Sequence, residues 1–147
     1  MKKLILASAV MLAMTGCFES DDFACDVSNS GTSVKVFNKY KDYKYEETST
    51  LKKDEYGYDY IDIVTKTTYP TNASANEACE DEKEEASYWH DGSHRTVCSG
   101  KTVTVYDYSD EDDLVDIEYN YERMCRTSRQ MYDSGMYEKA YKERFGL

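Results

Sequence analysis

A shortage of aliphatic side chains constrains the fold of this chain more than any other feature of its sequence. After residue 16 the chain has fourteen isoleucines, leucines and valines against fifteen tyrosines. A tyrosine buries its ring while its hydroxyl stays in water or forms a hydrogen bond. The composition therefore predicts a thin, tyrosine-packed sheet that is half covered by helices. The alternative is that some tyrosines form a binding face, because aromatic rings offer rigid contact area at low entropic cost.

The first residues of the chain form a leader with three parts. Two lysines begin it, and residues 4–14 form an apolar run that is too short to span a bilayer as a stable helix. Thr15 and Gly16 then place small residues just before Cys17. A basic start, a short apolar run and small residues at a cleavage point are typical of a secretory signal peptide. We therefore expect residues 1–16 to be removed.

The four residues Met14, Thr15, Gly16 and Cys17 resemble the lipobox of bacterial lipoproteins. The resemblance implies that the thiol of Cys17 is diacylated, with palmitate or a similar chain, and that Cys17 becomes the N-terminus. It also implies a lipoprotein that is anchored to the membrane of the bacterial cell envelope. Two or three acyl chains would anchor it firmly, since each buried methylene contributes about 0.8 kcal/mol. The alternative is a plain signal peptide with an incidental cysteine.

Residues 17–33 are predicted to be the lipidated cysteine and an acidic tether, and residues 34–147 a single globular domain. Glu19, Asp21 and Asp22 form an acidic cluster in this tether. The cluster resembles a signal that, in some Gram-negative groups, directs lipoproteins to the outer face of the outer membrane. A solvated spacer would have the same composition. The first interpretation places the domain on the outer membrane, exposed at the cell surface.

The net charge of the chain argues against several classes of partner. The formal charge is −11, and it becomes more negative when the two leader lysines are removed. A surface this acidic repels nucleic-acid phosphates and anionic lipid headgroups. We therefore expect no nucleic-acid partner, and we expect attachment to the membrane through the lipid. About 130 residues after the leader suit one domain with a modest core.

Four cysteines remain after Cys17, and an even number in an exported chain indicates two disulfides. No two of them stand in the Cys-x-x-Cys spacing of zinc sites, so we expect no metal there. Three pairings are possible. A helix that starts near Cys79 rises about 1.5 Å per residue, and the following strand can return the same distance to bring Cys98 beside the helix start. The favoured pairs are therefore Cys79 with Cys98 and Cys25 with Cys125.

Alternating residues predict the first strands. One alternating pattern runs over residues 34–45, with a change of phase at residues 41–42 that a bulge would absorb. A second, rich in tyrosine and isoleucine, runs over residues 56–68. The polar residues 48–55 lie between the two runs, so the pair is predicted to form an antiparallel hairpin.

The remainder of the chain predicts two more strands and three helices. The strands, residues 95–98 and 101–108, flank a Ser-Gly turn. A capping box of Ser74 and Glu77 opens a helix over residues 74–88, and Ser109 caps a longer one over residues 110–131. A last helical stripe ends the chain. Together these elements predict an α+β fold in which a small antiparallel sheet of about four strands is covered by two or three helices and stapled by two disulfides.

Aromatic residues supply the candidate binding residues. Tyr56, Tyr58 and Tyr60 alternate along a predicted strand, so their rings are expected on one face. Trp89 and His90 lie in the loop after the first helix, and Trp89 is the only tryptophan. We expect these five residues to form the binding face, if the protein has one.

The loop after the first helix also holds His90, Asp91 and His94, which could converge on a metal ion. Their spacing within a glycine-containing loop matches no defined ligand geometry. Solvated histidines of a surface loop explain the pattern more simply. We therefore expect no metal and no cofactor.

No catalytic motif stands out from the acidic background. The chain has no GxSxG, HExxH, phosphate-loop or dinucleotide-binding sequence, so we expect no catalytic residues and no enzymatic activity. The sequence favours a non-enzymatic binding or interaction module of the cell envelope, with an envelope protein or a polysaccharide as partner. The alternatives are a structural or accessory envelope lipoprotein without a ligand of its own, and a hydrolase that uses paired carboxylates.

Overall fold

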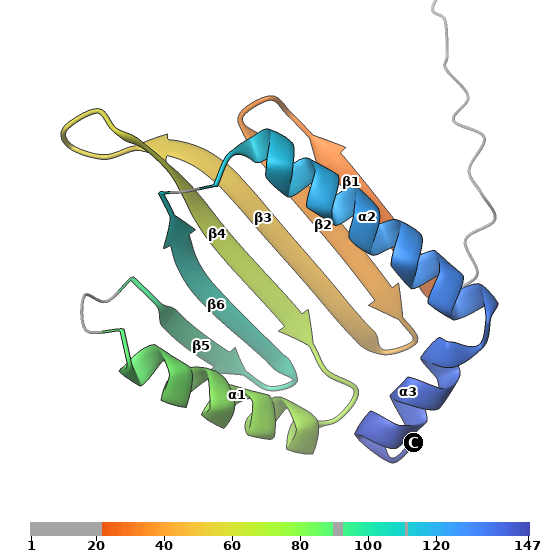
Figure 1. The fold of residues 1–147 in the computed structure, drawn as a ribbon. Helices are drawn as coiled ribbons and strands as arrows, with labels where there is room; N and C mark the ends of the chain where they lie inside the picture. Colours follow the sequence, from red (N-terminus) through yellow and green to blue (C-terminus); the bar gives the residue numbers. More distant parts are fainter. Residues whose placement is uncertain (1–21, 90–92, 111) are drawn as a thin grey trace, which may run out of the picture.

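The chain folds into one antiparallel sheet with helices packed on one of its two faces (Figure 1). A computed structural model describes residues 22–89, 93–110 and 112–147. The elements run in the order β1 (Phe23–Asn29), β2 (Ser33–Tyr40), β3 (Tyr43–Lys53), β4 (Asp59–Thr68), α1 (Asn72–Ser87), β5 (Arg95–Ser99), β6 (Thr102–Ser109), α2 (Leu114–Asp133) and α3 (Met136–Phe145). The strand order across the sheet is β1-β2-β3-β4-β6-β5. An α+β fold with an antiparallel sheet is therefore confirmed.

The sheet has six strands, whereas the sequence predicted about four. Residues of the expected tether form β1, because Phe23, Cys25 and Val27 point toward the core and pair with β2. The expected bulge at residues 41–42 is instead a tight turn that separates β2 from β3. Lys41 has a φ of +53° there, and Tyr40 pairs directly with Tyr43 across the turn.

The third strand is also longer than expected. The sequence predicted a polar connection over residues 48–55, but β3 continues to Lys53 and pairs with β4 from Lys44 to Lys53. The physical reason is that Ser49 is fully buried on the inner side, where its hydroxyl forms a hydrogen bond with the hydroxyl of Tyr121 in α2. A polar residue in this segment therefore belongs to the core.

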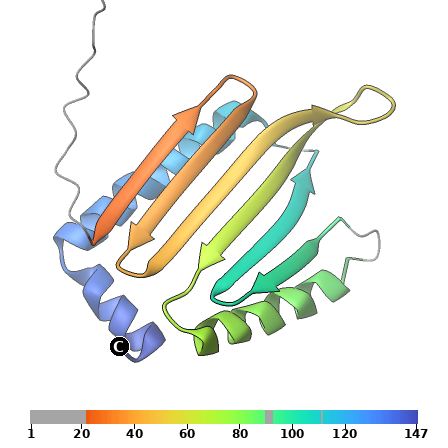
Figure 2. The same ribbon diagram turned by 180° about the vertical axis from the view of Figure 1, so that it is seen from behind.

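The strand register sorts the side chains of the sheet into two faces, because successive residues of a strand point to opposite sides. The face that packs against the helices, here called the helix face, carries the row Cys25, Asn38, Tyr45, Thr67, Val103 and Cys98. The opposite face, here called the open face, carries the row Ser28, Lys35, Thr48, Val64, Tyr106 and Arg95. Figure 2 shows the open face, with no helix across its central strands.

The core consists of three clusters on the helix face. Under α2, the buried residues are Val34, Val36, Ile61, Ile117 and Tyr121. Under α1, they are Tyr69, Ala75, Cys79 and Val103. Beside α3, they are Phe23, Tyr40 and Tyr141. Buried tyrosines occur in all three clusters, which confirms that tyrosine rings take over packing that aliphatic side chains perform in most proteins.

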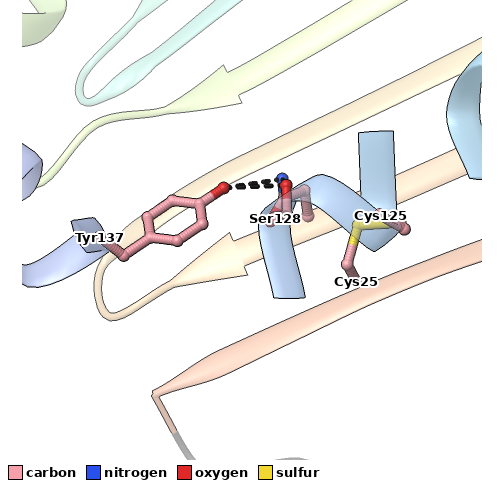
Figure 3. The surroundings of a disulfide bond; sticks show 5 residues. Cys25, Cys125, Ser128 and Tyr137 are labelled. Carbon is pink, nitrogen blue, oxygen red and sulfur yellow. Dashed lines mark hydrogen bonds between the residues drawn. A yellow bond between two sulfur atoms is a disulfide. The ribbon is translucent and has the colours of Figure 1, made fainter. Parts of the chain in front are cut away.

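Two disulfides join helices to the two edge strands of the sheet. Cys25 of β1 is bonded to Cys125 of α2, and Cys79 of α1 to Cys98 of β5. The predicted pairing is confirmed. Figure 3 shows the first bond beside a small polar network, in which Ser128 accepts a hydrogen bond from the hydroxyl of Tyr137 at 3.0 Å. Each edge strand is therefore held covalently to a helix.

Two helices begin at residues other than those predicted. The N-cap of α1 is Thr71, whose side chain accepts a hydrogen bond from the backbone of Ser74. The N-cap of α2 is Asp113, which holds the backbone of Asp116 in the same way. Ser74 and Ser109 were therefore wrong as caps, because the extended residues that precede each helix supply the acceptors.

The leader and most of the tether, including Cys17 and the acidic cluster, lie outside the described residues. Within the described ranges, no helix is long and apolar enough to cross a membrane.

Candidate functional site

A hollow of about 600 Å³ opens on the open face, where β4 and β6 approach the connection between β3 and β4. Three tyrosines and three aspartates line it: Asp54, Tyr58, Asp59, Tyr60, Tyr108 and Asp110. These six residues are called the tyrosine–aspartate hollow below. They come from two stretches of the sequence, residues 54–60 and 108–110, which the pairing of β4 with β6 brings together.

The connection between β3 and β4 is held in one shape by Asp54. Its carboxylate accepts hydrogen bonds from the backbone nitrogens of Tyr56, at 2.9 Å, and Tyr58, at 2.8 Å. Its own backbone nitrogen donates to the carbonyl of Tyr58. Gly57 has a φ of +89°, a conformation that side-chain-bearing residues rarely adopt. The turn therefore holds Tyr58 in place although 74% of that residue is exposed.

Tyr60 and Tyr108 form the sheet side of the hollow. Their rings meet edge to face, with centroids 6.2 Å apart. Tyr108 lies on β6 opposite Asp62 of β4. Tyr60 lies two residues before Asp62, so its side chain is on the same face of the sheet as that of Tyr108. Tyr108 is 46% exposed, so its ring packs on one side and remains open to a ligand on the other.

Two lysines compensate part of the negative charge near the hollow. Lys53 lies 2.6 Å from a carboxylate oxygen of Asp59, and Lys52 lies 2.5 Å from one of Asp62. The hydrogen bond that Lys52 donates to the carboxylate of Asp62 raises the pKa of Lys52. The carboxylate of Asp54 is bound by backbone nitrogens, as described above. The hollow is therefore less negative than three aspartates imply.

This arrangement offers the two kinds of contact that a sugar ring uses. The faces of the tyrosines can lie against the C–H face of a ring. The aspartate oxygens and tyrosine hydroxyls can accept and donate hydrogen bonds to ring hydroxyls. Concave sites with mostly apolar walls and a few placed polar groups are the common form of ligand sites.

The structure brings together only part of the predicted binding face. Tyr58 and Tyr60 line the hollow. Tyr56 lies in the same turn and is 78% exposed, but it is not among the lining residues. Trp89 is 54% exposed just beyond the end of α1, which lies apart from the β3–β4 connection in both views. His90 lies outside the described residues.

The sequence did not indicate Tyr108 or the three aspartates. Tyr108 reaches the hollow only because β4 pairs with β6, although α1 and β5 lie between these strands in the chain. The signal that could have found Asp54 is its position four residues before Tyr58, at the start of a short Gly-containing turn. Asp residues in such turns commonly bind nearby backbone nitrogens.

His94 was expected to be solvated, and this was wrong. Its side chain is only 8% exposed and lies between two carboxylates. Nε2 is 3.7 Å from Glu82 of α1, and Nδ1 is 3.6 Å from Asp107 of β6. His94 precedes β5 on the helix face, where α1 covers it. Among the described residues, Nε2 has no hydrogen-bond partner.

A carboxylate near the centre of the helix face is a further feature that the sequence did not reveal. Glu47 accepts hydrogen bonds from the hydroxyls of Tyr45, Tyr121 and Thr65. Burial and the bond to Glu47 raise the pKa of the Tyr121 hydroxyl, and burial and the charge of Glu47 raise that of Tyr45. Because its oxygens are occupied by protein donors, this group connects α2 to the sheet and is not a free catalytic acid.

Within the parts of the chain that the structure describes, no three histidine, cysteine or acidic side chains are placed to hold a metal ion. Comparisons with protein-family models, curated proteins and solved structures find no match for this chain. No family is therefore recognised for the domain.

Proposed function

We propose that this protein is a non-enzymatic binding module, anchored by lipid to the bacterial cell envelope, that holds a polysaccharide in the tyrosine–aspartate hollow. The anchor rests on the resemblance of residues 14–17 to a lipobox. The binding function rests on the hollow and its exposed rings.

The observation that carries the proposal is the fixed yet exposed position of Tyr58. Tyr58 is 74% exposed, so in the free protein its ring contributes little of the stabilisation that burying apolar surface would give. Here the backbone around the ring is nevertheless held by the two bonds to Asp54. Because the backbone of the turn is already ordered, its ordering does not add to the entropic cost of binding a ligand at this ring, and a smaller cost means higher affinity.

The charge balance favours a sugar over an organic cation. Aromatic rings with carboxylates also bind ammonium groups, but Lys53 already pairs with Asp59, and backbone nitrogens already bind Asp54. Of the three lining carboxylates, this leaves only Asp110 to attract a cation. What remains is a set of acceptors beside three rings, which suits the hydroxyls of a sugar. The partner is therefore a polysaccharide in this account.

Affinity electrophoresis tests the proposal. The full-length chain, in a polyoxyethylene detergent that has no sugar headgroup, is run through native gels that contain polygalacturonate, alginate, a neutral glucan or a neutral mannan. At least one polymer is expected to retard it. Tyr58→Ala should weaken the retention by about 1 kcal/mol or more, which is about fivefold, because exposed aromatic anchors dominate such interfaces.

Tyr119→Ala is the matched control, since Tyr119 is 59% exposed but lies on α2. It should bind like the parent chain. Equal losses from the two variants, or no retardation by any of the four polymers, would refute polysaccharide binding at the hollow. Saturable binding of choline that Tyr58→Ala removes, without polysaccharide retention, would assign the hollow to an organic cation instead.

A further inference from the structure

The open face carries positive charge although the chain as a whole is acidic. Its strand positions hold three carboxylates, Asp26, Glu46 and Asp62, against the six cations Lys35, Lys39, Lys44, Lys52, Lys66 and Arg95. Helix α1 shows the reverse, with six acidic residues and one lysine. On the face whose central strands no helix covers, cations therefore outnumber carboxylates two to one.

Several of these cations are available to a partner. Lys35, Lys44 and Lys66 are exposed, and within the described ranges none of them forms an ion pair. Arg95 is exposed and its guanidinium lies over the ring of Tyr106 at 4.0 Å. Lys52 is the exception, since it is paired with Asp62. Unpaired lysines on a flat surface attract anions at low ionic strength.

The free cations continue from the tyrosine–aspartate hollow along the same face. Tyr106 lies two residues before Tyr108 on β6, and Arg95 lies opposite Tyr106 on β5. Lys66 lies on β4 four residues beyond Asp62, the partner of Tyr108, which is roughly 14 Å along the strand at about 3.4 Å per residue. The hydroxyls of Thr48, Thr104 and neighbouring threonines fill the positions between the cations.

We infer that the ligand is an acidic polysaccharide, which places one sugar in the hollow and its carboxylate or sulfate groups on the cations of the open face. This inference rests on the proposed function of the hollow. Charge complementarity selects the chemistry, because the face offers a surplus of three cations and the remainder of the protein repels anions. The distance from Tyr108 to Lys66 requires a ligand longer than a monosaccharide, hence a polymer.

The test compares two triple variants that change the net charge equally. Lys35→Gln with Lys44→Gln and Lys66→Gln removes charge from the open face. Lys83→Gln, Lys139→Gln and Arg126→Gln remove the same charge from exposed helix positions, as the matched control. Both are made in the full-length chain and run in affinity gels with polygalacturonate and with a neutral glucan, at about 30 and 300 mM salt.

We expect tighter binding to polygalacturonate than to the neutral glucan, and about tenfold weaker binding at the higher salt concentration. The open-face triple should lose at least tenfold on polygalacturonate and nothing on the glucan, and the control triple should behave as the parent. Equal losses in both triples would show an effect of net charge alone and overturn the inference.

Other outcomes separate the inference from the proposed function. Equal retention by glucan and polygalacturonate, with both dependent on Tyr58, leaves the function standing and refutes the acidic ligand. Retention by none of the four polymers named above refutes both. Lysine-dependent binding to phosphatidylglycerol vesicles without binding to polygalacturonate would make the partner a membrane surface. A DNA duplex held as strongly as polygalacturonate would mean that the face recognises charge alone. Either result overturns the inference.

Discussion

Removing the hydroxyl of Tyr121 on the helix face should destabilise the protein markedly. Tyr121 is 8% exposed, and its hydroxyl is shared between the carboxylate of Glu47 and the hydroxyl of Ser49, which is fully buried. Tyr121→Phe keeps the ring and deletes only these bonds. The core packing of α2 against β2 and β4 is therefore retained.

The expected loss follows from the groups that remain without a partner. A hydrogen bond to a charged group contributes about 1.5–3 kcal/mol, and an orphaned buried polar group costs about 1–3 kcal/mol. Glu47 keeps its bonds from Tyr45 and Thr65, so the lower end of the summed range of about 2.5–6 kcal/mol applies. We expect a loss of about 2–3 kcal/mol in the free energy of unfolding, which is a large share of the 5–15 kcal/mol typical of a domain.

Urea unfolding at pH 7 with both disulfides intact, followed by far-ultraviolet circular dichroism, measures this loss. At an m-value of about 1–3 kcal/mol/M, the midpoint should fall by about 1 M or more. Tyr119→Phe is the control, because Tyr119 is 59% exposed on the same helix. A loss below about 0.5 kcal/mol for Tyr121→Phe, or an equal loss for the control, would refute a structural role for the carboxylate network.

Three more predictions follow from the charges and the leader. The pKa of Tyr121 is raised in the folded protein, so the stability that its hydroxyl contributes should be full below about pH 10 and lost as the pH rises further. Unfolding at pH 11 should therefore ionise this hydroxyl and increase the tyrosinate absorbance at 295 nm. Lys41 and the Tyr40 hydroxyl lower the pKa of Glu138 to about 2, so stability should fall as the pH drops from about 4.5 toward 2, and Glu138→Gln should flatten this part of the curve. Mass spectrometry of the mature N-terminal peptide should find acyl chains on Cys17, and an unmodified N-terminus elsewhere would contradict the lipobox.

The sequence predicted those parts of the fold that depend on neighbouring residues. Cys79 and Cys98 bracket one helix and one strand, so their pairing followed from the length of each element. Strands β5 and β6 flank a Gly-containing turn, which marks a hairpin directly. The outer strand Phe23–Asn29 was missed because its inner positions include a cysteine and it follows an acidic segment. The turn at Lys41 was missed because it contains neither glycine nor asparagine.

The candidate site was predictable only in the turn that carries Tyr58. The other side of the hollow includes Tyr108, which reaches it because β4 pairs with β6. These two strands are separated in the chain by α1 and β5, so the sequence did not indicate that they are neighbours. The positive open face was hidden by the acidic total, since a net charge does not show how charges divide between two faces. His94 was misjudged for a similar reason, because the carboxylates beside it come from two other elements.

Nuclear magnetic resonance tests binding at the hollow most directly. Oligogalacturonate of several sugar units is titrated into the ¹⁵N-labelled full-length chain in polyoxyethylene detergent, and amide shifts are followed. The account predicts saturable shifts at residues 54–60 and 106–110, which extend to Lys66 and Arg95 on the open face and leave α1 and α2 unchanged. Shifts centred on the helices, or none at any concentration below millimolar, would contradict it.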